Sequence, residues 1–489
     1  MSRCSRPLLA VTLLVPSVAA AAWSDAVLAD RPVAWFRFEE DRGDIAKSAV
    51  GQVEGRYRNV VPAQTSAAPA LGRASAFSPK PSQPANIDIP VPLPAGDFTI
   101  EWWQLDESTA ANRPILTWSD GDGPSFEISV RDEPPDPKNR KKPIFAHCHA
   151  GASRSASFAY CGKWFHIVLV RNAANGTIQW FINGQIDGKP TKAATPALPR
   201  SAKLRVGGEA FRGALDELAV YETALAADRV LAHYRAALSS LPDREKIVTV
   251  GHRGNNQFAP ENTRISYVQA VDSGTPVVEM DLRLTSDGEI ILMHDDTVNR
   301  TTNARGKIAQ FTAEQIQKLD AGSWKDPKYR GESVPRLEQI TDVCRGKAIM
   351  MLDLKATGLG EKLAQWLSTT KFPKDKVILA PWTDEEGEAL RRHLPDLPMI
   401  RLSGKVPVET VDDAYFTKMK AIGFSGFSID WRFLPQSFVE AAHRHGMNVY
   451  TWTVNAPPEV SGAVLAGVDG IVTDDPAAVM RLVSSLAAK

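Results

Sequence analysis

The sequence predicts a multidomain protein in which an all-β jelly-roll sandwich precedes an α/β TIM barrel of the (β/α)8 type. Its 489 residues are too many for one ordinary hydrophobic core, so two domains are expected. Residues 23–238 contain short strand-like runs separated by Gly, Pro, Asn and Asp, without sustained helical periodicity. From Lys246 onward, apolar strands alternate with helical stretches, which is typical of a parallel sheet covered by helices.

The first 22 residues have the layout of a secretory signal peptide. Arg3 and Arg6 precede an apolar run at residues 8–15, and four alanines at residues 19–22 supply the small side chains of a cleavage site. The apolar run is too short to span a bilayer stably. We therefore expect an exported protein that is periplasmic or extracellular after cleavage before Trp23.

The charge balance excludes a partner that is bound mainly by electrostatics. Lys and Arg number 57 and Asp and Glu also number 57, so the formal net charge is zero. Neither nucleic acid nor an anionic membrane surface is implied by such a balance. The 43% hydrophobic and 23% charged residues are those of a soluble globular protein.

Three cysteines follow the predicted signal peptide. In an oxidising compartment, Cys148 and Cys161 are candidates for a disulfide across a local hairpin, with Cys344 left over. The alternative is that all three are buried free thiols.

The sandwich is expected over residues 23–238. Asn175-Gly176 and Asn183-Gly184 are hairpin signals on either side of the run 177–182. The spacing of the runs is typical of an antiparallel sandwich. The expected strands are 34–38, 98–104, 115–118, 126–130, 164–171, 177–182 and 204–206.

Several longer strings in this region carry a family pattern. They are residues 33–40, 98–103, 164–170, 180–184 and 213–221. Together they resemble the laminin-G or concanavalin-like jelly-roll family. The resemblance implies a sugar- or polymer-binding, adhesion or spacer module, with a glycan or cell-surface ligand as its partner, and it names no particular ligand.

Residues 239–245, which contain Ser and Pro, form the expected linker to a barrel at residues 246–489. The barrel segment is close to the roughly 250 residues of a typical (β/α)8 barrel. A doubly wound open sheet is the second choice, but no Gly-rich phosphate loop supports it. Because the linker is short, the two domains are expected to touch. The expected strands are 247–250, 277–280 with 290–293 nearby, 349–354, 377–380, 399–402, 426–429, 449–453 and 470–472.

Polar side chains gather where the expected barrel strands end, which is where barrel enzymes place catalytic groups. Glu279 and Asp281 alternate along one strand, so both face one side and offer the oxygen ligands that Ca²⁺ and Mg²⁺ prefer. His252 and His294 end two other strands and suit proton transfer near neutral pH. These groups indicate metal-assisted attack on a phosphodiester, and the alternative is incidental charge at strand ends. The other strand ends bring Arg253, Asp295, Asp353, Lys355, Asp430, Trp452, Asn455 and Asp474.

A more specific pattern runs through residues 246–485. Its strings are Gly251-His252-Arg253-Gly254, Pro260-Glu261-Asn262-Thr263, Glu279-Met280-Asp281, Thr285-Ser286-Asp287-Gly288, His294-Asp295, Arg300-Thr301-Thr302, residues 334–338, Trp452-Thr453-Val454-Asn455 and residues 469–474. This pattern is similar to that of the glycerophosphodiester phosphodiesterase family. The resemblance implies a TIM barrel that hydrolyses glycerophosphodiesters with the help of a divalent metal, Ca²⁺ or Mg²⁺.

The resemblance also implies a role for the acids and histidines at matching positions. His252 and His294 would be the general acid–base pair, and Glu279, Asp281 and Asp353 would be the metal ligands. The family usually has Glu-x-Lys where this chain has an aspartate, at position 353. The aspartate keeps the charge but is shorter by one methylene, so metal affinity or preference is expected to differ there.

The remaining matching positions are implied to contact substrate or support the site. Arg253 and Lys355 would contact the phosphate, and Glu261 and Asn262 would support the site or bind the metal. Trp452 would stack on the carbon skeleton of the substrate, or else only line the barrel.

The leading functional hypothesis is an exported, metal-dependent phosphodiesterase that releases glycerol 3-phosphate and an alcohol from glycerophosphodiesters or from a glycerol-phosphate polymer. A second hypothesis is a carbohydrate- or matrix-binding protein whose sandwich does the binding and whose barrel is vestigial. A third is a barrel phospholipase, similar to phospholipase D enzymes, that acts on intact lipids.

Overall fold

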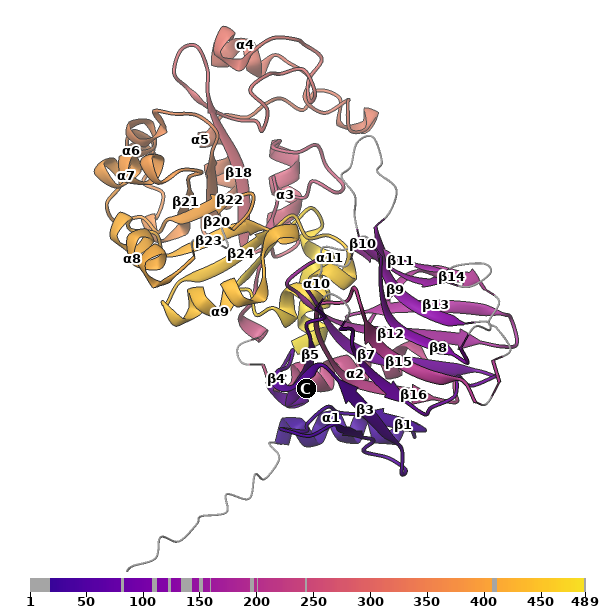
Figure 1. The fold of residues 1–489 in the computed structure, drawn as a ribbon. Helices are drawn as coiled ribbons and strands as arrows, with labels where there is room; N and C mark the ends of the chain where they lie inside the picture. Colours follow the sequence, from indigo (N-terminus) through magenta and orange to yellow (C-terminus); the bar gives the residue numbers. More distant parts are fainter. Residues whose placement is uncertain are drawn as a thin grey trace, which may run out of the picture.

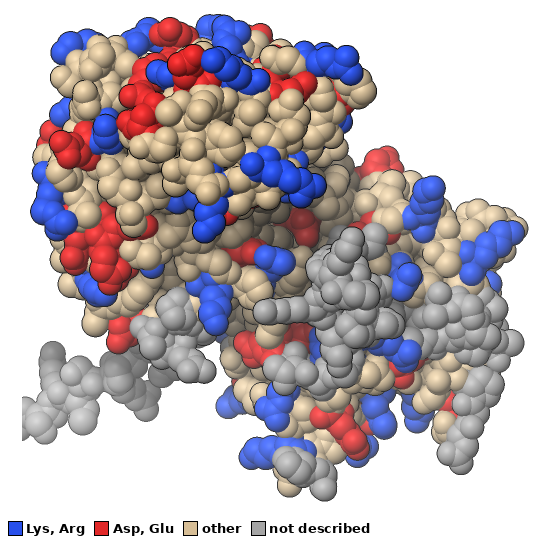
Figure 2. All heavy atoms as spheres, turned by 90° about the horizontal axis from the view of Figure 1, so that it is seen from above, with Lys and Arg blue, Asp and Glu red and all other residues tan. Residues whose placement is uncertain are grey.

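The computed structural model describes residues 18–487 except 81–82, 108–111, 122–124, 133–142, 149–152, 159, 194–197, 200, 242–243 and 407–410. Two domains lie side by side, a β-sandwich from the N-terminal half and a barrel from the C-terminal half (Figure 1). Seen from above, acidic and basic side chains are interspersed over both domains (Figure 2). This mixed surface agrees with the balanced charge of the sequence.

The N-terminal domain is an antiparallel sandwich of two sheets, which confirms the predicted fold class. One sheet has the order β14-β13-β12-β7-β16-β5-β4, with β1 paired to β16, and the other has the order β11-β10-β9-β8-β15-β6-β3-β2. Trp102, Trp118 and Trp180 help to fill the core between the sheets, and each is at most 2% exposed. The strands are β1 Ala34–Phe36, β2 Ile45–Lys47, β3 Glu54–Arg58, β4 Val60–Thr65, β5 Arg73–Phe77, β6 Ala85–Ile89, β7 Phe98–Asp106, β8 Asn112–Ser119, β9 Phe126–Asp132, β10 Pro143–Cys148, β11 Arg154–Phe158, β12 Trp164–Asn172, β13 Thr177–Ile182, β14 Gln185–Lys192, β15 Lys203–Gly208 and β16 Gly213–Tyr221.

Helix α1 (Val18–Ala29) packs against helix α2 (Ala227–Leu238) beside the sandwich. Trp23 of α1 is fully buried and meets Trp103 edge-on. The helix overlaps the end of the predicted signal peptide, while residues 1–17 lie outside the described residues, so export and cleavage stay predictions. In the part of the chain that the structure describes, no helix is long and apolar enough to cross a membrane.

A buried carboxylate ties both helices to the sandwich. Glu101 of β7 accepts a hydrogen bond from the Tyr221 hydroxyl at 2.7 Å. The same carboxylate lies 2.7 Å from His166 Nε2 and 3.0 Å from His233 Nδ1. Burial opposes ionisation, but the two imidazoles hold the pKa of Glu101 below its usual range. His233 Nε2 also lies 2.8 Å from Asp30 at the end of α1, so this network joins α1, α2 and the sheet.

The C-terminal domain is a closed barrel of parallel strands, which confirms the predicted (β/α)8 fold and excludes the open sheet. Strand β17 pairs with both β18 and β25, and a parallel bridge from Leu379 to Met399 joins β21 to the start of β22. Strand β19 pairs antiparallel with the end of β18. The strands are β17 Val248–Gly251, β18 Val277–Leu284, β19 Ile290–Leu292, β20 Ile349–Leu354, β21 Val377–Ala380, β22 Ile400–Ser403, β23 Gly426–Asp430, β24 Asn448–Trp452 and β25 Gly470–Thr473.

Helices cover the outside of the barrel, and three of them, α4, α7 and α8, begin at a residue whose side chain accepts a backbone N–H of the first turn. Helix α7, for example, begins at a capping box in which Thr383 accepts the Glu386 N–H and the Glu386 side chain accepts the Thr383 N–H. The helices are α3 Arg264–Asp272, α4 Ala313–Gln317, α5 Leu337–Cys344, α6 Leu359–Thr370, α7 Asp384–His393, α8 Asp413–Ile422, α9 Gln436–Arg444, α10 Pro457–Leu465 and α11 Pro476–Ala487.

The two domains are in direct contact, as the short linker predicts. The Asn183 side-chain amide donates to the Pro458 carbonyl at 3.0 Å, and the Tyr234 hydroxyl donates to the Ser461 carbonyl at 2.8 Å. Gly462 permits this close approach, because a Cβ there would lie 2.8 Å from Asn183 Nδ2. The sandwich therefore rests on α10, the helix that follows barrel strand β24.

Of the two cysteines in the predicted Cys148–Cys161 disulfide, only Cys161 has a described side chain. Cys161 is a free, exposed thiol, and Cys344 is a free, buried one. The side chain of Cys148, at the end of β10, lies outside the described residues. The pairing therefore stays a prediction.

Candidate active site

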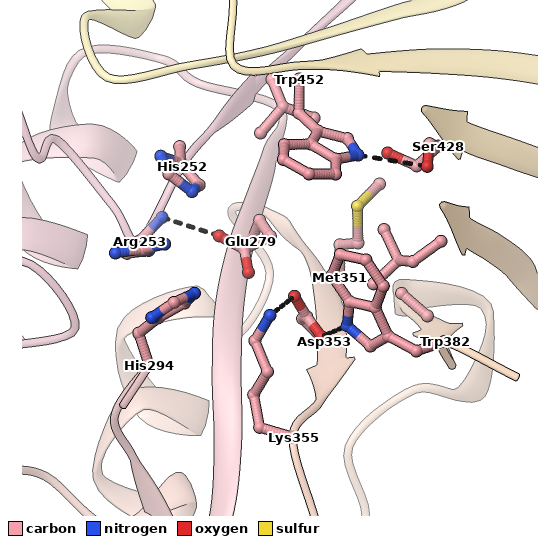
Figure 3. Close-up of a pocket in the computed structure, with 13 residues that line it drawn as sticks. His252, Arg253, Glu279, His294, Met351, Asp353, Lys355, Trp382, Ser428 and Trp452 are labelled. Atoms are coloured by element: carbon pink, nitrogen blue, oxygen red, sulfur yellow. Dashed lines mark hydrogen bonds and ion pairs between the residues drawn. The ribbon is translucent and has the colours of Figure 1, made fainter. Parts of the chain in front are cut away.

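Several of the polar residues predicted at the strand ends line one cavity at the carboxyl ends of the barrel strands. The cavity has an empty volume of about 500 Å³ and is open to solvent. His252 and His294 lie on one side of it and Trp382 and Trp452 on the other, with Glu279 between them (Figure 3). The lining residues are His252, Arg253, Glu279, His294, Met351, Asp353, Lys355, Ala380, Trp382, Leu402, Ser428, Trp452 and Val472.

Three buried carboxylates cluster at the polar side of the cavity, and two of them, Glu279 and Asp353, line it. Glu279 and Asp281 point to one face of β18, and the parallel register places Asp281 beside Asp353 of β20. One oxygen from each carboxylate lies within 4.8 Å of the others. Burial and repulsion by the two neighbours raise the pKa of Glu279 well above its usual value. A hard divalent cation such as Ca²⁺ or Mg²⁺ fits this set, because it would offset the concentrated charge with oxygen ligands.

Asp353 is held on both of its oxygens. Trp382 Nε1 donates to Oδ1 at 2.7 Å, and Lys355 Nζ lies 2.6 Å from Oδ2. The ammonium group of Lys355 also lies 3.5 Å from Asp281 and 4.6 Å from the centre of the Trp382 ring. The shorter aspartate side chain is thus brought into the cluster by neighbours on β20 and on the segment after β21.

Arg253 and Asn262 brace the carboxylates from the loop after β17. The Arg253 backbone N–H donates to Glu279 at 2.9 Å, and its Nε lies 3.1 Å from Asp281 as an ion pair. Asn262 donates to Asp281 at 2.7 Å and accepts from the Tyr267 hydroxyl at 2.7 Å. Both residues have positive φ, 54° and 56°, so the loop turns back toward the carboxylates at each of them. Although burial opposes it, the charges of Arg253 and Lys355 keep the pKa of Asp281 below its usual value.

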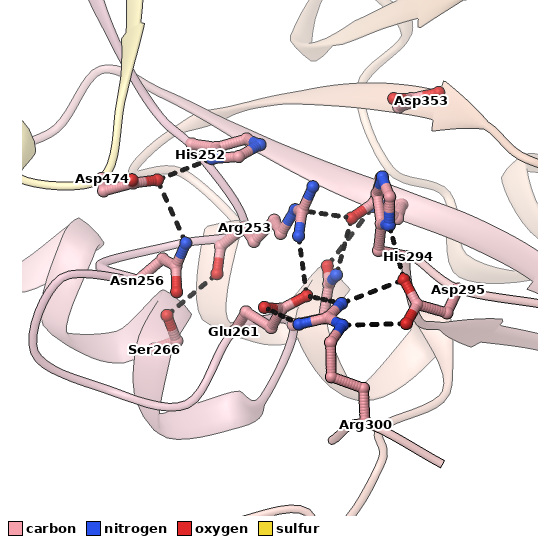
Figure 4. Close-up of polar contacts among 12 residues, drawn as sticks. His252, Arg253, Asn256, Glu261, Ser266, His294, Asp295, Arg300, Asp353 and Asp474 are labelled. Carbon is pink, nitrogen blue, oxygen red and sulfur yellow. Dashed lines mark hydrogen bonds and ion pairs between the residues drawn. The ribbon is translucent and has the colours of Figure 1, made fainter. Parts of the chain in front are cut away.

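Glu261 does not line this cavity and belongs to a network of polar contacts that includes Arg300, Asp295 and His294 (Figure 4). It accepts hydrogen bonds from Arg253 at 2.8 Å and from Arg300 at 2.7 and 2.9 Å. Arg300 also donates to Asp295, whose Oδ1 lies 2.8 Å from His294 Nδ1. The pKa of Asp295 is lowered mainly by the hydrogen bond from Arg300. Glu261 thus forms ion pairs with Arg253 and Arg300 in the structure, and its role stays a prediction.

His252, which follows β17, is fixed by an acid that follows the neighbouring strand β25. Its Nδ1 lies 2.6 Å from Asp474 Oδ1, just beyond β25, and Asn256 and Asn455 also donate to Asp474. Burial opposes ionisation, but these hydrogen bonds and the charge of His252 lower the pKa of Asp474 to about 2. An ionised carboxylate only accepts hydrogen bonds, so Nδ1 carries a proton and Nε2 is left for a substrate.

His294 is also held at Nδ1 by a carboxylate, that of the next residue in the chain, Asp295. Its Nδ1 faces Asp295, which is ionised because Arg300 holds it. Burial lowers the pKa of His294, and the nearby charge of Asp281 only partly opposes this. His294 is therefore neutral near pH 7, with Nδ1 protonated and Nε2 able to accept a proton.

Trp452 lines the apolar side of the cavity and is not simply part of the barrel core. Its ring meets Trp382 edge-on with centroids 5.8 Å apart, and its Nε1 donates to the Ser428 carbonyl at 3.2 Å. Asp430, which was also expected at a strand end, does not line the cavity and pairs with Arg432.

Sequence reasoning missed two residues that contact the site. Trp382 lies two residues after the end of β21, so its place after a barrel strand was a usable signal. Arg283 continues the alternation of Glu279 and Asp281 along β18 and donates to the carbonyl of His294. Neither belongs to the strings that carried the family pattern.

Comparison with known proteins assigns a family to each domain. Residues 252–478 match the glycerophosphoryl diester phosphodiesterase family, and residues 81–231 match the concanavalin A-like lectin/glucanases superfamily. The chain is 31% identical over 244 residues to a glycerophosphodiester phosphodiesterase of Caldanaerobacter subterraneus subsp. tengcongensis, covering 49% of this chain and 98% of the relative. It is 31% identical over 258 residues to a glycerophosphodiester phosphodiesterase of Bacillus subtilis, covering 49% of this chain and 88% of the relative.

Solved structures also align with the barrel. A phosphodiesterase of Oleispira antarctica, solved with its product sn-glycerol-3-phosphate, is 25% identical with a TM-score of 0.45 and covers 48% of this chain and 96% of its own. From the nearly full coverage of curated relatives at 31% identity, we conclude that this chain is an enzyme of the glycerophosphodiester phosphodiesterase family, with its barrel as the family domain and a concanavalin-like sandwich attached.

Proposed function

We propose that this protein is an exported, divalent-metal-dependent phosphodiesterase that hydrolyses glycerophosphodiesters to glycerol 3-phosphate and an alcohol. One observation carries the proposal: two histidines, each with Nδ1 held by a carboxylate, line the same cavity as Glu279 and Asp353, whose carboxylates cluster with that of Asp281. Family membership supplies the reaction class, and this arrangement supplies groups for each proton transfer.

The carboxylate cluster would hold the metal, and Arg253 and Lys355 would meet the phosphate from either side of it. When bound, the cation would neutralise phosphate oxygens and so favour attack on phosphorus. The two cationic side chains are already held in place by their ion pairs with Asp281 and Asp353. Substrate would therefore meet positive groups that need little rearrangement.

In the proposed reaction, His294 is the base and His252 is the acid. Neutral His294 takes the proton of the glycerol 2-hydroxyl at Nε2, and the freed oxygen attacks phosphorus. His252 gives a proton from Nε2 to the oxygen of the departing alcohol. Asp474 suits His252 to the role of acid. The other side chains that donate to Asp474 are neutral amides, so the charge of Asp474 remains to stabilise the His252 imidazolium. Asp295 instead shares its charge with Arg300.

Water then opens the cyclic phosphate with the roles reversed. His252 takes a proton from the water, whose oxygen attacks phosphorus, and His294 returns its proton to the glycerol 2-oxygen. The products are glycerol 3-phosphate and the free alcohol, and both histidines regain their starting protonation.

The apolar side of the cavity, with Trp382 and Trp452, would contact the carbon skeleton of the substrate. The sandwich would bring the enzyme to a glycan or to the cell surface, in keeping with the superfamily that its residues match. A glycerol-phosphate polymer is a second substrate that this arrangement fits, since its repeating unit carries the same phosphodiester.

The test is a parallel assay of glycerophosphocholine, glycerophosphoethanolamine, a poly(glycerol phosphate) and intact phosphatidylcholine, each with Ca²⁺, Mg²⁺ or chelator. We expect metal-dependent release of glycerol 3-phosphate from at least one deacylated substrate. Faster cleavage of the intact lipid would favour the phospholipase hypothesis. Glycan-array binding without any hydrolysis would favour the binding-protein hypothesis, and turnover that survives complete chelation would refute the metal requirement.

A further inference from the structure

Arg283 joins the two active-site segments that lie beyond β18. It sits two residues after Asp281 on a strand that extends past the barrel and pairs with β19. Because side chains alternate along a strand, Arg283 shares its face with Glu279 and Asp281. It is half-buried, and burial lowers the pKa of its guanidinium despite the acids around it.

The guanidinium of Arg283 donates hydrogen bonds to the backbone carbonyls of two functional residues. Nε and Nη2 donate to the carbonyl of His294 at 2.9 and 2.6 Å, and Nη1 donates to the carbonyl of Lys355 at 3.0 Å. Among the described residues, no other side chain donates to either carbonyl. Arg283 therefore bridges the loop that carries the base and the strand end that carries the phosphate-binding lysine.

His294 depends on such a bridge more than His252 does. His252 is anchored to the end of the neighbouring strand β25, because its ring meets Asp474 and its backbone N–H donates to the Thr473 carbonyl. The carboxylate that orients His294 is its own chain neighbour, Asp295, and so moves with the same loop. Its ring is also the more exposed of the two, with 37% against 16% of the side-chain surface accessible.

We propose that Arg283 is a positioning residue that fixes the distance between His294 and Lys355, and hence between the base and the bound phosphate. This inference rests on the proposed roles of those two residues. Only a guanidinium suits the position, because its fixed fork of donors spans two carbonyls, whereas an ammonium is a compact point charge. Arg283 touches no reacting atom, so its effect passes through the two backbones that it holds.

The test compares Arg283→Met and Arg283→Lys with a matched control, Arg391→Met. Arg391 also bridges backbone carbonyls, those of Pro395, Leu397 and Gly423, but it lies on α7 and lines no part of the cavity. For each variant, kcat and KM for glycerophosphocholine and the melting temperature are measured with saturating Mg²⁺ or Ca²⁺. A displacement of about 1 Å at a reacting group costs roughly 100-fold in rate, which sets the expected scale.

We expect both Arg283 variants to lose about 100-fold in kcat with KM changed far less, because ground-state binding does not need the base in place. The control should lose melting temperature but keep kcat. Added guanidinium, at concentrations that leave the wild type unaffected, should restore part of the kcat of an Arg283→Ala variant.

The inference is overturned if the Arg283 variants keep kcat within about threefold of wild type. It is also overturned if Arg391→Met loses as much kcat as the Arg283 variants at a similar loss of melting temperature. If Arg283→Met does not fold, the charge-retaining Arg283→Lys decides on the same criteria. Loss of the proposed function looks different, since the wild type would then release no glycerol 3-phosphate.

Discussion

Trp382 Nε1 lies 2.7 Å from Asp353 Oδ1, so the indole N–H fixes the third carboxylate of the proposed metal site. The opposite oxygen of Asp353 meets Lys355 at 2.6 Å. An indole from the segment after β21 therefore helps to place a carboxylate at the end of β20. This contact matters because the aspartate is shorter than the glutamate that the family pattern carries at this position.

Removing that hydrogen bond should weaken metal binding. In Trp382→Phe the ring remains but the N–H is lost, so Asp353 is free to rotate and the apparent Kd for the metal should rise about 10-fold or more. Isothermal titration with Ca²⁺ and Mg²⁺ measures it. Trp366→Phe is the matched control, since Trp366 Nε1 donates to Thr341 on the outside of the barrel. Equal affinity in Trp382→Phe and wild type would show that the contact does not tune the site.

Metal affinity should also decrease when the pH is lowered. Burial and the charge of Asp281 raise the pKa of Asp353 to about 7, so this carboxyl holds a proton below that pH. The proton must leave before the oxygen binds a cation, and affinity should therefore increase as pH rises through 7. We expect binding about tenfold weaker at pH 6 than at pH 8. Titrations in buffers of different ionisation enthalpy would reveal the released proton, and a Kd that is constant across this range would contradict the prediction.

Asp474 should matter for rate more than for binding. Asp474→Asn keeps the size of the side chain but removes the charge that stabilises protonated His252. A loss of general acid catalysis typically costs 100-fold to 10,000-fold, so kcat should fall by about 100-fold or more with little change in melting temperature. Steady-state kinetics on glycerophosphocholine checks this. A variant within threefold of wild type would remove His252 from the proposed acid role.

Lys163 should make stability depend on pH. This lysine is 3% exposed, and among the described residues its Nζ has no hydrogen-bond partner and lies 4.6 Å from the centre of the Trp431 ring across the domain contact. Burial lowers its pKa to about 7, although Cys161, Asp430 and Glu459 act in the opposite direction. An unfolded lysine keeps its proton up to about pH 10.4, so between about pH 7 and 10 the folded state binds fewer protons.

The sign of the effect follows from that difference. Where the unfolded state binds more protons, the free energy of unfolding rises with pH, so this contribution should grow between about pH 7 and 10. Lys163→Met should remove the rise and stabilise the protein at pH 7. Urea unfolding at pH 7 and pH 9 tests it, with Lys203→Met, at an exposed position on β15, as the control. The same pH dependence in Lys163→Met and wild type would contradict the prediction.

The sequence predicted the barrel closely because its strands are buried on both sides and stand out as apolar runs. The predicted strand 349–354 coincides with β20, and 377–380 coincides with β21. The sandwich was predicted as a class, but several of its strands were not. Strand β14 (Gln185–Lys192), for example, is mostly exposed and contains a proline, so it lacks the alternation that identifies a strand.

In the site, too, some features could be predicted from the sequence and others could not. The residues in the family strings could be placed at strand ends from order alone, and the structure brings His252, His294, Glu279 and Asp353 to one cavity. The contacts of Arg283 could not be foreseen, because its partners are backbone carbonyls, which leave no trace in side-chain pattern. The sequence alone could not decide whether Trp452 stacks on substrate or only packs in the barrel core, since both roles require an aromatic side chain at that position.

The central claim is tested most directly by the rate of glycerol 3-phosphate release from glycerophosphocholine by His252→Ala and His294→Ala, measured beside the wild type with saturating metal. Both variants should keep the wild-type melting temperature, because neither ring is part of the core, and each should lose kcat by about 100-fold to 10,000-fold. Near wild-type turnover in either variant would contradict the assignment of these two histidines as the acid–base pair.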